Sequence, residues 1–426
     1  MDRSPMDMVY TARYLLPMVG APIEDGAVSI RGGRIVSVGR RQDLPPASAG
    51  AAVHDFGDAV LLPPMVNAHT HLELTDFPRW AKELGETGEP GSFTDWVLRV
   101  IRVKRGIDPE RYRPSLEEGI RRSLLAGTGA VGDVLSWFPA REAYQDSPLY
   151  GRLFLETLGR DPEIGRRVLG TIGRILDKGG AWRLQFGVSP HSPYTLSAEY
   201  LEDVLDFVRR RSLPASMHFA ESPEEVAFLL ESEGDLARVL YPFVGWGDML
   251  PPPARRRPAP YLAERGGLVP WNLLAHGVQV EGSDFEALAS AGSPVVLCPR
   301  SNARLKVGRP PAARYLKSGI PLALGTDSLA SNDSLSVWDE LAFAASWLEE
   351  APPEALLQAA TLGGARALGL DGEMGALQPG WGGHFQVLRP KVLPPLDELF
   401  SFLCAPGRGA EVAALVLDGR EVLPKG

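Results

Sequence analysis

Histidines in this sequence lie at the ends of short apolar runs, where their side chains could meet. Five of the seven do so: His69, His71, His191, His218 and His276. His69 and His71 stand one residue apart in VNAHTHLEL, and on a strand such a pair points to the same side. A single histidine at a strand end is usually a core residue. Five of them, together with Asp327 after a further apolar run, indicate a site built on imidazole nitrogens.

Binding of one divalent metal ion explains this combination best. His69, His71, His218 and Asp327 would supply three nitrogen donors and one carboxylate. This set suits Zn²⁺, while Fe²⁺ and Mn²⁺ stay open because imidazole-rich sites bind several such ions. A divalent ion lowers the pKa of a water ligand from about 15.7 towards about 7. The residues therefore predict hydrolytic chemistry at neutral pH.

Two further residues are candidates for proton transfer and charge stabilisation. Glu221 follows His218 by three residues in HFAES, close to the metal without being a ligand. We expect it to carry a proton between the water, a ring nitrogen and the leaving group, although a surface glutamate is the alternative. His276 is expected to hydrogen-bond the attacking water. Asp327 is expected to accept the proton of that water besides binding the metal.

Eight apolar, strand-like runs would position these residues. They begin near residues 61, 127, 149, 183, 214, 272, 294 and 321, and helical patterns such as 197–211 and 336–350 lie between or after them. Eight such units are typical of a closed, parallel (β/α)8 barrel of the TIM type, whose active sites lie at the C-terminal ends of the strands. An open doubly wound sheet is the alternative, but no Gly-x-Gly-x-x-Gly turn follows the first run.

The segments outside these runs predict a second unit and two long loops. Residues 26–39 read as a hairpin around two glycines, and short strand patterns return at 384–390 and 411–423. The two ends of the chain could therefore form one small β-domain. Insertions at 76–98 and 233–271 follow the first and fifth runs, where they are placed to cover a substrate.

Composition excludes several other classes of protein. The chain has 426 residues, 44% hydrophobic and 23% charged, which is ordinary for a globular enzyme. Its net charge of −9 argues against nonspecific binding to nucleic acid or to anionic membranes. Two cysteines allow no disulfide framework, and neither a signal-peptide core nor a membrane-spanning run is found. We expect a cytoplasmic protein.

The sequence resembles the amidohydrolase superfamily over nearly its whole length. The matching segments occur in order: NAHTHLE (67–73), SPHSPYT (189–195), HFAE (218–221), LLAHGV (273–278), CPRSNARLKVG (298–308) and GTDSLASN (325–332). The resemblance implies an α/β fold, a (β/α)8 barrel with a small β-sandwich formed by both termini. We accordingly predict sandwich parts at 1–58 and 373–426 and a metal-dependent barrel over 59–372.

The fourth run places this sequence in one branch of that superfamily. Members with two metals carry a carboxylated lysine there, whereas FGVSPHSPYT has none. The resemblance thus implies the one-metal branch, most of which deaminates aromatic rings. SFTDWVLRVI (92–101), FLETLG (154–159), CPRSN and GTDSLASN are most similar to aminodeoxyfutalosine deaminases, which act in menaquinone biosynthesis by the futalosine route. SPHSPYT and SNARLKVG are also similar to deaminases of S-adenosylhomocysteine and methylthioadenosine, so these substrates and adenosine stay open.

The resemblance also suggests substrate contacts, for which structural roles are equally open. His191 could meet the ribose, Glu156 could accept hydroxyls, and Arg300, Ser301 and Asn302 could meet the base or a carboxylate. The 5′ arm of 6-aminodeoxyfutalosine ends in a benzoate and needs an apolar slot with a cation near its end. Trp80, Phe93 and Trp96 could form the slot. Arg300 or an arginine of 233–271 could bind the carboxylate.

Other functions share the same ligand set. A chlorohydrolase of chlorotriazines or an amide hydrolase would need the same metal, so only substrate contacts distinguish them. An inactive barrel with a structural role is the remote alternative, since every expected ligand and Glu221 are present. The partner expected is a small nucleoside, with no nucleic acid and no membrane, and the sequence leaves a homodimer open.

Overall fold

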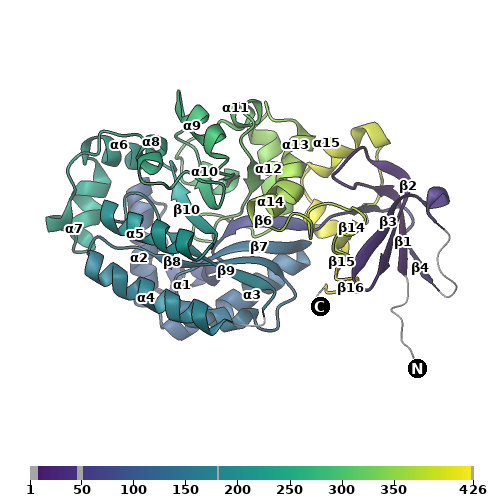
Figure 1. Cartoon of the computed structure of the whole chain (residues 1–426), viewed down its shortest axis with the longest axis horizontal. Helices are drawn as coiled ribbons and strands as arrows, with labels where there is room; N and C mark the ends of the chain where they lie inside the picture. The colour runs from purple at the N-terminus through teal and green to yellow at the C-terminus, as the bar shows by residue number, and fades with distance from the viewer. Residues whose placement is uncertain (1–7, 46–50, 180–181, 424–426) are drawn as a thin grey trace.

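The strands of this protein form two separate sheets. The structure, a computed structural model, describes residues 8–45, 51–179 and 182–423. Figure 1 shows the two parts side by side, with the strands from both ends of the chain gathered in the smaller one. Among the described residues, no helix is long and apolar enough to cross a membrane.

The larger part is the predicted parallel barrel. Its eight strands follow one another in chain order: β6 (Met65–Thr70), β7 (Thr128–Leu135), β8 (Tyr150–Thr157), β9 (Leu184–Pro190), β10 (Ala215–Phe219), β11 (Asn272–His276), β12 (Val295–Leu297) and β13 (Leu322–Leu324). Thr70 and Asp327 form a parallel bridge between the first strand and the end of the last, so the ring nearly closes. The barrel prediction is confirmed.

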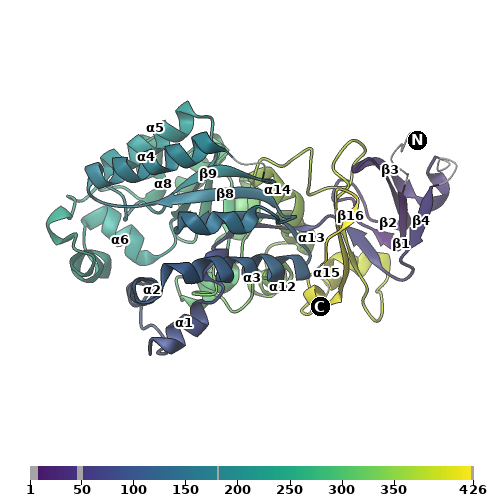
Figure 2. The same cartoon turned by 90° about the horizontal axis from the view of Figure 1, so that it is seen from below.

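Helices surround this ring. They are, in chain order, α1 (Phe77–Glu83), α2 (Phe93–Gly106), α3 (Tyr112–Leu125), α4 (Pro162–Lys178), α5 (Ala198–Arg210), α6 (Pro223–Glu231), α7 (Tyr241–Phe243), α8 (Pro258–Glu264), α9 (Asp284–Ala291), α10 (Pro299–Arg304), α11 (Ala312–Lys317), α12 (Val337–Trp347), α13 (Pro353–Gln358), α14 (Gly364–Ala367) and α15 (Leu399–Leu403). Figure 2 shows α4 and α5 side by side against β8 and β9.

Helix α5 illustrates how the sequence specifies these helices. Ser197 caps its N-terminus by accepting a hydrogen bond from the backbone N–H of Tyr200, and two arginines in the last turn favour its C-terminal end. Tyr200, Leu201, Val204, Leu205 and Val208 are buried, at the three- and four-residue spacing of one helix face. The charged residues between them face solvent, and the barrel-facing side of the helix is therefore fixed by sequence.

The smaller part is one mixed sheet. It contains β1 (Met8–Leu15), β2 (Ile23–Arg31), β3 (Arg34–Arg40), β4 (Ala52–Asp55), β5 (Val60–Leu62), β14 (Phe385–Leu388), β15 (Val412–Leu417) and β16 (Arg420–Glu421). Gly32 and Gly33 have φ values of 58° and 78°, as a two-residue hairpin turn between β2 and β3 requires. Strand β5 pairs with β1 and β14, which joins the two ends of the chain. The domain limits at 58/59 and 372/373 stay a prediction.

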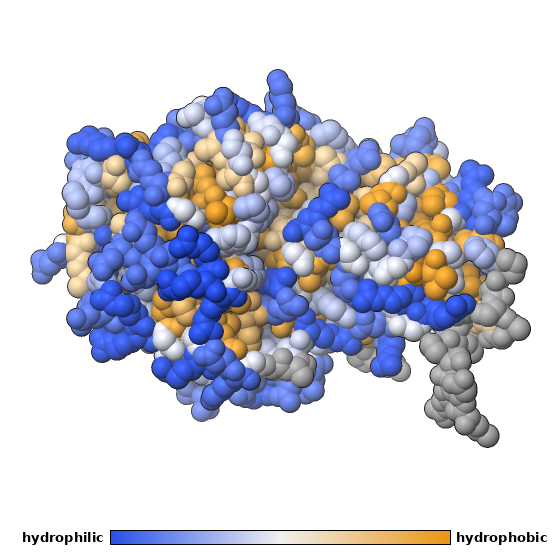
Figure 3. Space-filling model, viewed as in Figure 1, coloured by the Kyte–Doolittle hydropathy of each residue, from blue (hydrophilic) through white to orange (hydrophobic). Residues whose placement is uncertain are grey.

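Figure 3 shows one face of the molecule, on which hydrophobic patches are separated by hydrophilic residues. The two insertions fold into short helices at the barrel mouth. The first contains α1 and the start of α2, and the second contains α7 and α8.

Candidate metal centre and active site

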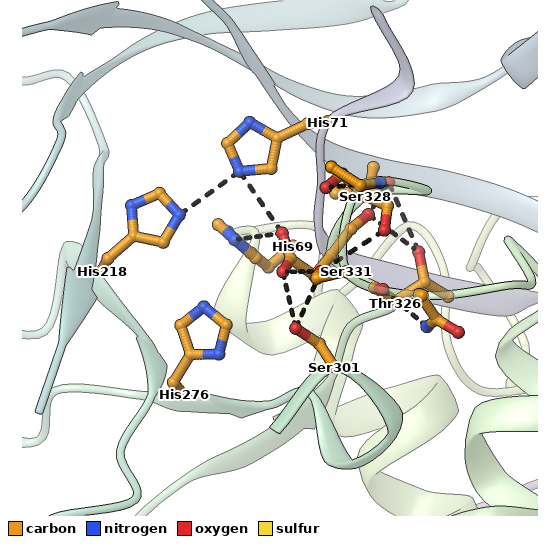
Figure 4. A network of polar contacts seen from close by, with 12 residues as sticks. His69, His71, His218, His276, Ser301, Thr326, Ser328 and Ser331 are labelled. Carbon is orange, nitrogen blue, oxygen red and sulfur yellow. Dashed lines mark hydrogen bonds and ion pairs between the residues drawn. The ribbon is translucent and has the colours of Figure 1, made fainter. Parts of the chain in front are cut away.

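Four histidines and one aspartate meet at the C-terminal ends of the barrel strands. Figure 4 shows His69, His71, His218 and His276 turned toward a common centre. His71 Nε2 lies 3.3 Å from His218 Nε2 and 3.6 Å from Asp327 Oδ1. The ligand atoms of His69, His218, His276 and Asp327 all lie within 4.8 Å of one another. The strand-end positions inferred from the sequence thus converge in space.

Burial keeps these imidazoles neutral. Desolvation is the largest cause that lowers the pKa of His69, His71 and His218, and the neighbouring histidines lower it further. Neutral imidazole is the form that binds metal. Neither ring nitrogen of His69 has a hydrogen-bond partner among the described residues, although the side chain is buried. Buried polar atoms normally have a partner, and a divalent cation at the centre of this group would satisfy one ring nitrogen of His69.

Hydrogen bonds from the second ring nitrogen orient two of the histidines. Nδ1 of His218 lies 2.8 Å from the carbonyl oxygen of His191, so it carries the proton and leaves Nε2 free toward the centre. Nδ1 of His276 lies 2.9 Å from Oδ1 of Asn302 in the same way. Asn302 is fully buried. It positions His276 and does not line the cavity, and its contact with the base or a carboxylate stays a prediction.

Asp327 is held by two serines. Its Oδ2 accepts hydrogen bonds from Ser301 at 2.8 Å and from Ser331 at 2.6 Å, which leaves Oδ1 toward the histidines. The φ of Asp327 is 55°, an uncommon value for a residue other than glycine, and its backbone N–H bonds to the carbonyl of His69. Ser301 therefore fixes the Asp327 carboxylate and does not line the cavity, and its contact with a substrate stays a prediction.

Glu221 lies beside this group with an unsatisfied carboxyl oxygen. It is buried, its Oε1 has no hydrogen-bond partner among the described residues, and this atom lies 3.6 Å from Nε2 of His276. Burial, and then the charge of Asp327, raise the pKa of Glu221 well above its usual value. The raised pKa favours the protonated form of the carboxyl group, which is the form that can donate a proton to a bound molecule.

A cavity of about 480 Å³ opens onto His218 and Glu221. One wall is apolar and comes from α2, with Trp96, Val97, Val100 and Ile101. The other wall comes from the second insertion and contains Leu240, Val244 and Trp246. Both insertions thus line the cavity, and their role in covering a substrate stays a prediction.

Only some of the predicted substrate contacts lie in this cavity. His191, Glu156 and Trp96 line it. Phe93 instead packs on Trp96 and lines an adjoining depression of about 290 Å³. Trp80 is fully buried and packs against Tyr112, because the apolar face of α1 turns it into the core. The structure therefore places Trp80 outside the residues that line the cavity, and its part in a substrate slot stays a prediction.

The predicted cations for the carboxylate are engaged elsewhere. Arg300 pairs with Asp333 and hydrogen-bonds Asn332, outside the cavity. The arginines of the 233–271 insertion are all in ion pairs with acidic residues. The cavity contains two cations that the sequence analysis missed, Lys104 and Arg105. The period of α2 could have revealed them, since Lys104 and Arg105 lie two turns beyond Trp96 and Val97 on the same face.

Arg105 is the free cation of this pair. It is exposed, stacks over the ring of Phe243 at 5.6 Å and makes no hydrogen bond or ion pair with the residues that the structure describes. Lys104 instead donates a hydrogen bond to Ser136 and lies 3.8 Å from the buried carboxylate of Glu73. An anionic group at the cavity mouth would therefore meet Arg105 first.

Comparison of the sequence with known proteins identifies a family and its relatives. The sequence model of the Amidohydrolase family matches residues 60–422. The chain is 31% identical to an aminodeoxyfutalosine deaminase of Deinococcus radiodurans, covering 85% of this chain and 84% of that one. It is 30% identical to a 5-methylthioadenosine/S-adenosylhomocysteine deaminase of Nitratidesulfovibrio vulgaris, over 98% and 92% of the two chains.

A solved structure shares the fold of this chain. The crystal structure of a Xanthomonas campestris adenosine deaminase with bound zinc superposes with a TM-score of 0.81 at 24% identity, covering 98% of this chain and 93% of that one. The span matched by the family model includes every strand of the barrel and all five residues of the histidine and aspartate group. This protein belongs to the amidohydrolase family and is a hydrolytic enzyme.

Proposed function

We propose that this protein is a metal-dependent deaminase of an adenine-bearing nucleoside, with 6-aminodeoxyfutalosine as the substrate. His69, His71, His218 and Asp327 are the proposed ligands of one ion. Zinc is the proposed metal, because three neutral imidazoles and a carboxylate suit it and a relative of the same fold binds zinc. The cytoplasmic location and the place in menaquinone biosynthesis belong to the same proposal.

The side chains divide the reaction among them. When bound, the metal acts as a Lewis acid that makes a water molecule nucleophilic at neutral pH. Asp327 accepts the proton which that water loses as it attacks C6 of the purine. Glu221 donates a proton to N1, which makes C6 electrophilic, and His276 hydrogen-bonds the oxygen that adds. Asp327 then gives the proton it accepted to the amino group, which leaves as ammonia as the C6–N bond breaks. The hydroxyl proton of the adduct returns to Glu221, so that the product carries a C6 carbonyl and a proton on N1.

The choice of nucleoside depends on the residues of α2 that line the cavity. The single observation that carries it is the guanidinium of Arg105, which has no hydrogen-bond or ion-pair partner among the described residues and lines the same cavity as Glu221 and the apolar residues of α2. A 5′ arm with an aromatic ring and a terminal carboxylate matches both features, because the ring contacts the apolar wall and the carboxylate pairs with Arg105. The Deinococcus radiodurans relative supports the same nucleoside.

Deamination of S-adenosylhomocysteine or methylthioadenosine is the second candidate. It is favoured by the Nitratidesulfovibrio vulgaris relative, which matches 98% of this chain. Methylthioadenosine has no charge on its 5′ arm and would leave Arg105 without a partner.

The experiment that tests the reaction class is ammonia release from 6-aminopurine nucleosides by the purified metal-loaded enzyme. A chlorotriazine, assayed for chloride release, serves as the comparison for the chlorohydrolase alternative. We expect ammonia from at least one nucleoside and no chloride. Chloride release without any ammonia would overturn the deaminase proposal and favour the chlorohydrolase.

A further inference from the structure

Glu225 is a fully buried acidic residue that the proposed reaction does not use. It lies in the first turn of α6, and its two oxygens accept hydrogen bonds from consecutive backbone N–H groups. Oε1 accepts from Ala220 at 3.0 Å, and Oε2 accepts from Glu221 at 2.9 Å. The turn that carries the Glu221 side chain is therefore held by both oxygens of one acid.

This arrangement differs from ordinary helix capping. Ser222 and Glu225 have the Ser-x-x-Glu spacing of a capping box, and Ser222 does accept a hydrogen bond from the N–H of Glu225. In a capping box the glutamate would return to the N–H of the serine. Glu225 instead bonds to the N–H groups of the two residues before Ser222. The Glu225 carboxylate therefore binds the turn after β10 and not the N-terminus of its own helix.

The same turn is tied to the turn that follows His276. The carbonyl of Ala220 accepts hydrogen bonds from the N–H groups of Val278 at 2.9 Å and Gln279 at 2.8 Å. Ala220 and His276 both have positive φ values, 48° and 76°, which residues other than glycine rarely adopt. Ala220 is thus clamped on its N–H side by Glu225 and on its carbonyl side by the His276 turn.

We propose that Glu225 is a positioning residue that sets the geometry between Glu221 and His276. This inference rests on the roles given to those two residues under the proposed function. The clamp holds two strained turns against each other, so that Glu221 Oε1 stays 3.6 Å from His276 Nε2. Loss of one acceptor oxygen would release the N–H of Ala220 or Glu221 and let the Glu221 side chain move.

The test is a double-mutant cycle on kcat with Glu225→Gln and Glu221→Gln. The glutamine keeps one acceptor oxygen and turns an amino group toward the second N–H. With Glu221 present, we expect Glu225→Gln to lower kcat by about tenfold or more, with KM changed less than about threefold and one metal ion retained. In the Glu221→Gln background the same change should alter kcat by less than about twofold, because Glu225 acts through Glu221.

Two further variants separate positioning from stability. Ser222→Ala removes the helix cap but leaves both bonds of Glu225 in place, so the protein should unfold at a lower temperature with kcat per bound metal unchanged. If Glu225→Gln does not fold, Glu225→Asp keeps two oxygens on a shorter arm and should give an intermediate kcat. Equal losses of kcat in both backgrounds, or a Glu225→Gln enzyme above half the original kcat, would overturn the proposal. Unchanged kcat in Glu221→Gln alone would instead overturn the role of Glu221.

Discussion

Glu221 could be identified from its position in the sequence, but its buried surroundings could not. Its position three residues after His218 made it a candidate, and the structure places it in a buried pocket next to His276. The sequence could not predict what surrounds it. Its unsatisfied oxygen and raised pKa arise from contacts between turns that lie far apart along the chain.

The first prediction concerns this residue. Glu221→Gln should retain one metal ion but lower kcat by about 10²–10⁴-fold, because an amide cannot transfer the proton. Steady-state kinetics and metal analysis of the same preparation measure both quantities. A variant that keeps more than about a tenth of the original kcat with its metal bound would show that another group moves the proton.

The second prediction tests Arg105. Arg105→Gln should raise KM for nucleosides with an anionic 5′ arm by about tenfold, the range of one charge-assisted hydrogen bond, and leave methylthioadenosine nearly unaffected. Arg102→Gln is the matched control, since Arg102 lies on the same helix and pairs with Glu86 outside the cavity. Equal effects of Arg105→Gln on charged and uncharged nucleosides would contradict this role.

Elements of the barrel show where sequence patterns succeed and fail. Periodicity identified α5 and α12 because their apolar positions repeat at helical spacing. The run LLPPMVNAH reads as one strand, but Pro63 and Pro64 divide it into β5, which joins the terminal sheet, and β6, which starts the barrel. The burial of Trp80 could not be predicted for a related reason: one aromatic residue does not reveal which face of a short helix meets the core.

Strand β7 contributes a buried acid whose titration can be measured. Asp133 accepts hydrogen bonds from the N–H of Leu72 and the hydroxyl of Tyr144, each at 2.8 Å. Burial raises the pKa of Asp133 from its usual value near 3.8 to about 8. The folded protein therefore keeps a proton that the unfolded chain releases. The contribution of this proton to the free energy of unfolding is complete below about pH 4 and is lost as the pH rises to about 8.

The third prediction follows from this sign. The Asp133→Asn variant carries no titrating group at this position, so the wild type should lose stability relative to the variant as the pH rises from about 5 to about 8. Urea unfolding of both proteins across this range measures the difference. A constant difference between the two proteins would mean that Asp133 is ionised throughout.

At the scale of the whole molecule, the barrel was predictable because eight apolar runs recur with helices between them. The convergence of the metal-facing residues follows from that architecture, since parallel strands end on one face. The supporting contacts were not predictable. Ser301 and Asn302 hold Asp327 and His276 across segments that sequence order separates by about one repeat unit.

The fourth prediction links the metal to the fold. Removing the ion with a chelator should lower Tm, and adding Zn²⁺ should restore it, because a ligand bound only by the folded state stabilises it by about 2.7 kcal/mol at 100 times its Kd. Glu221→Gln is the control, and its Tm should change with chelator and with Zn²⁺ by as much as that of the wild type. The chelated protein must be shown to be metal-free by metal analysis. If its Tm equals that of the untreated protein and does not change when Zn²⁺ is added, metal binding does not stabilise the fold.

The most direct test of the central claim is a comparison of kcat/KM for four nucleosides with the metal-loaded enzyme: 6-aminodeoxyfutalosine, methylthioadenosine, S-adenosylhomocysteine and adenosine. We expect 6-aminodeoxyfutalosine to have the highest kcat/KM, because its aromatic carboxylate uses both the apolar wall and Arg105. A higher kcat/KM for any of the other three would contradict the substrate assignment while leaving a deaminase. No turnover of any of the four would contradict the deaminase itself.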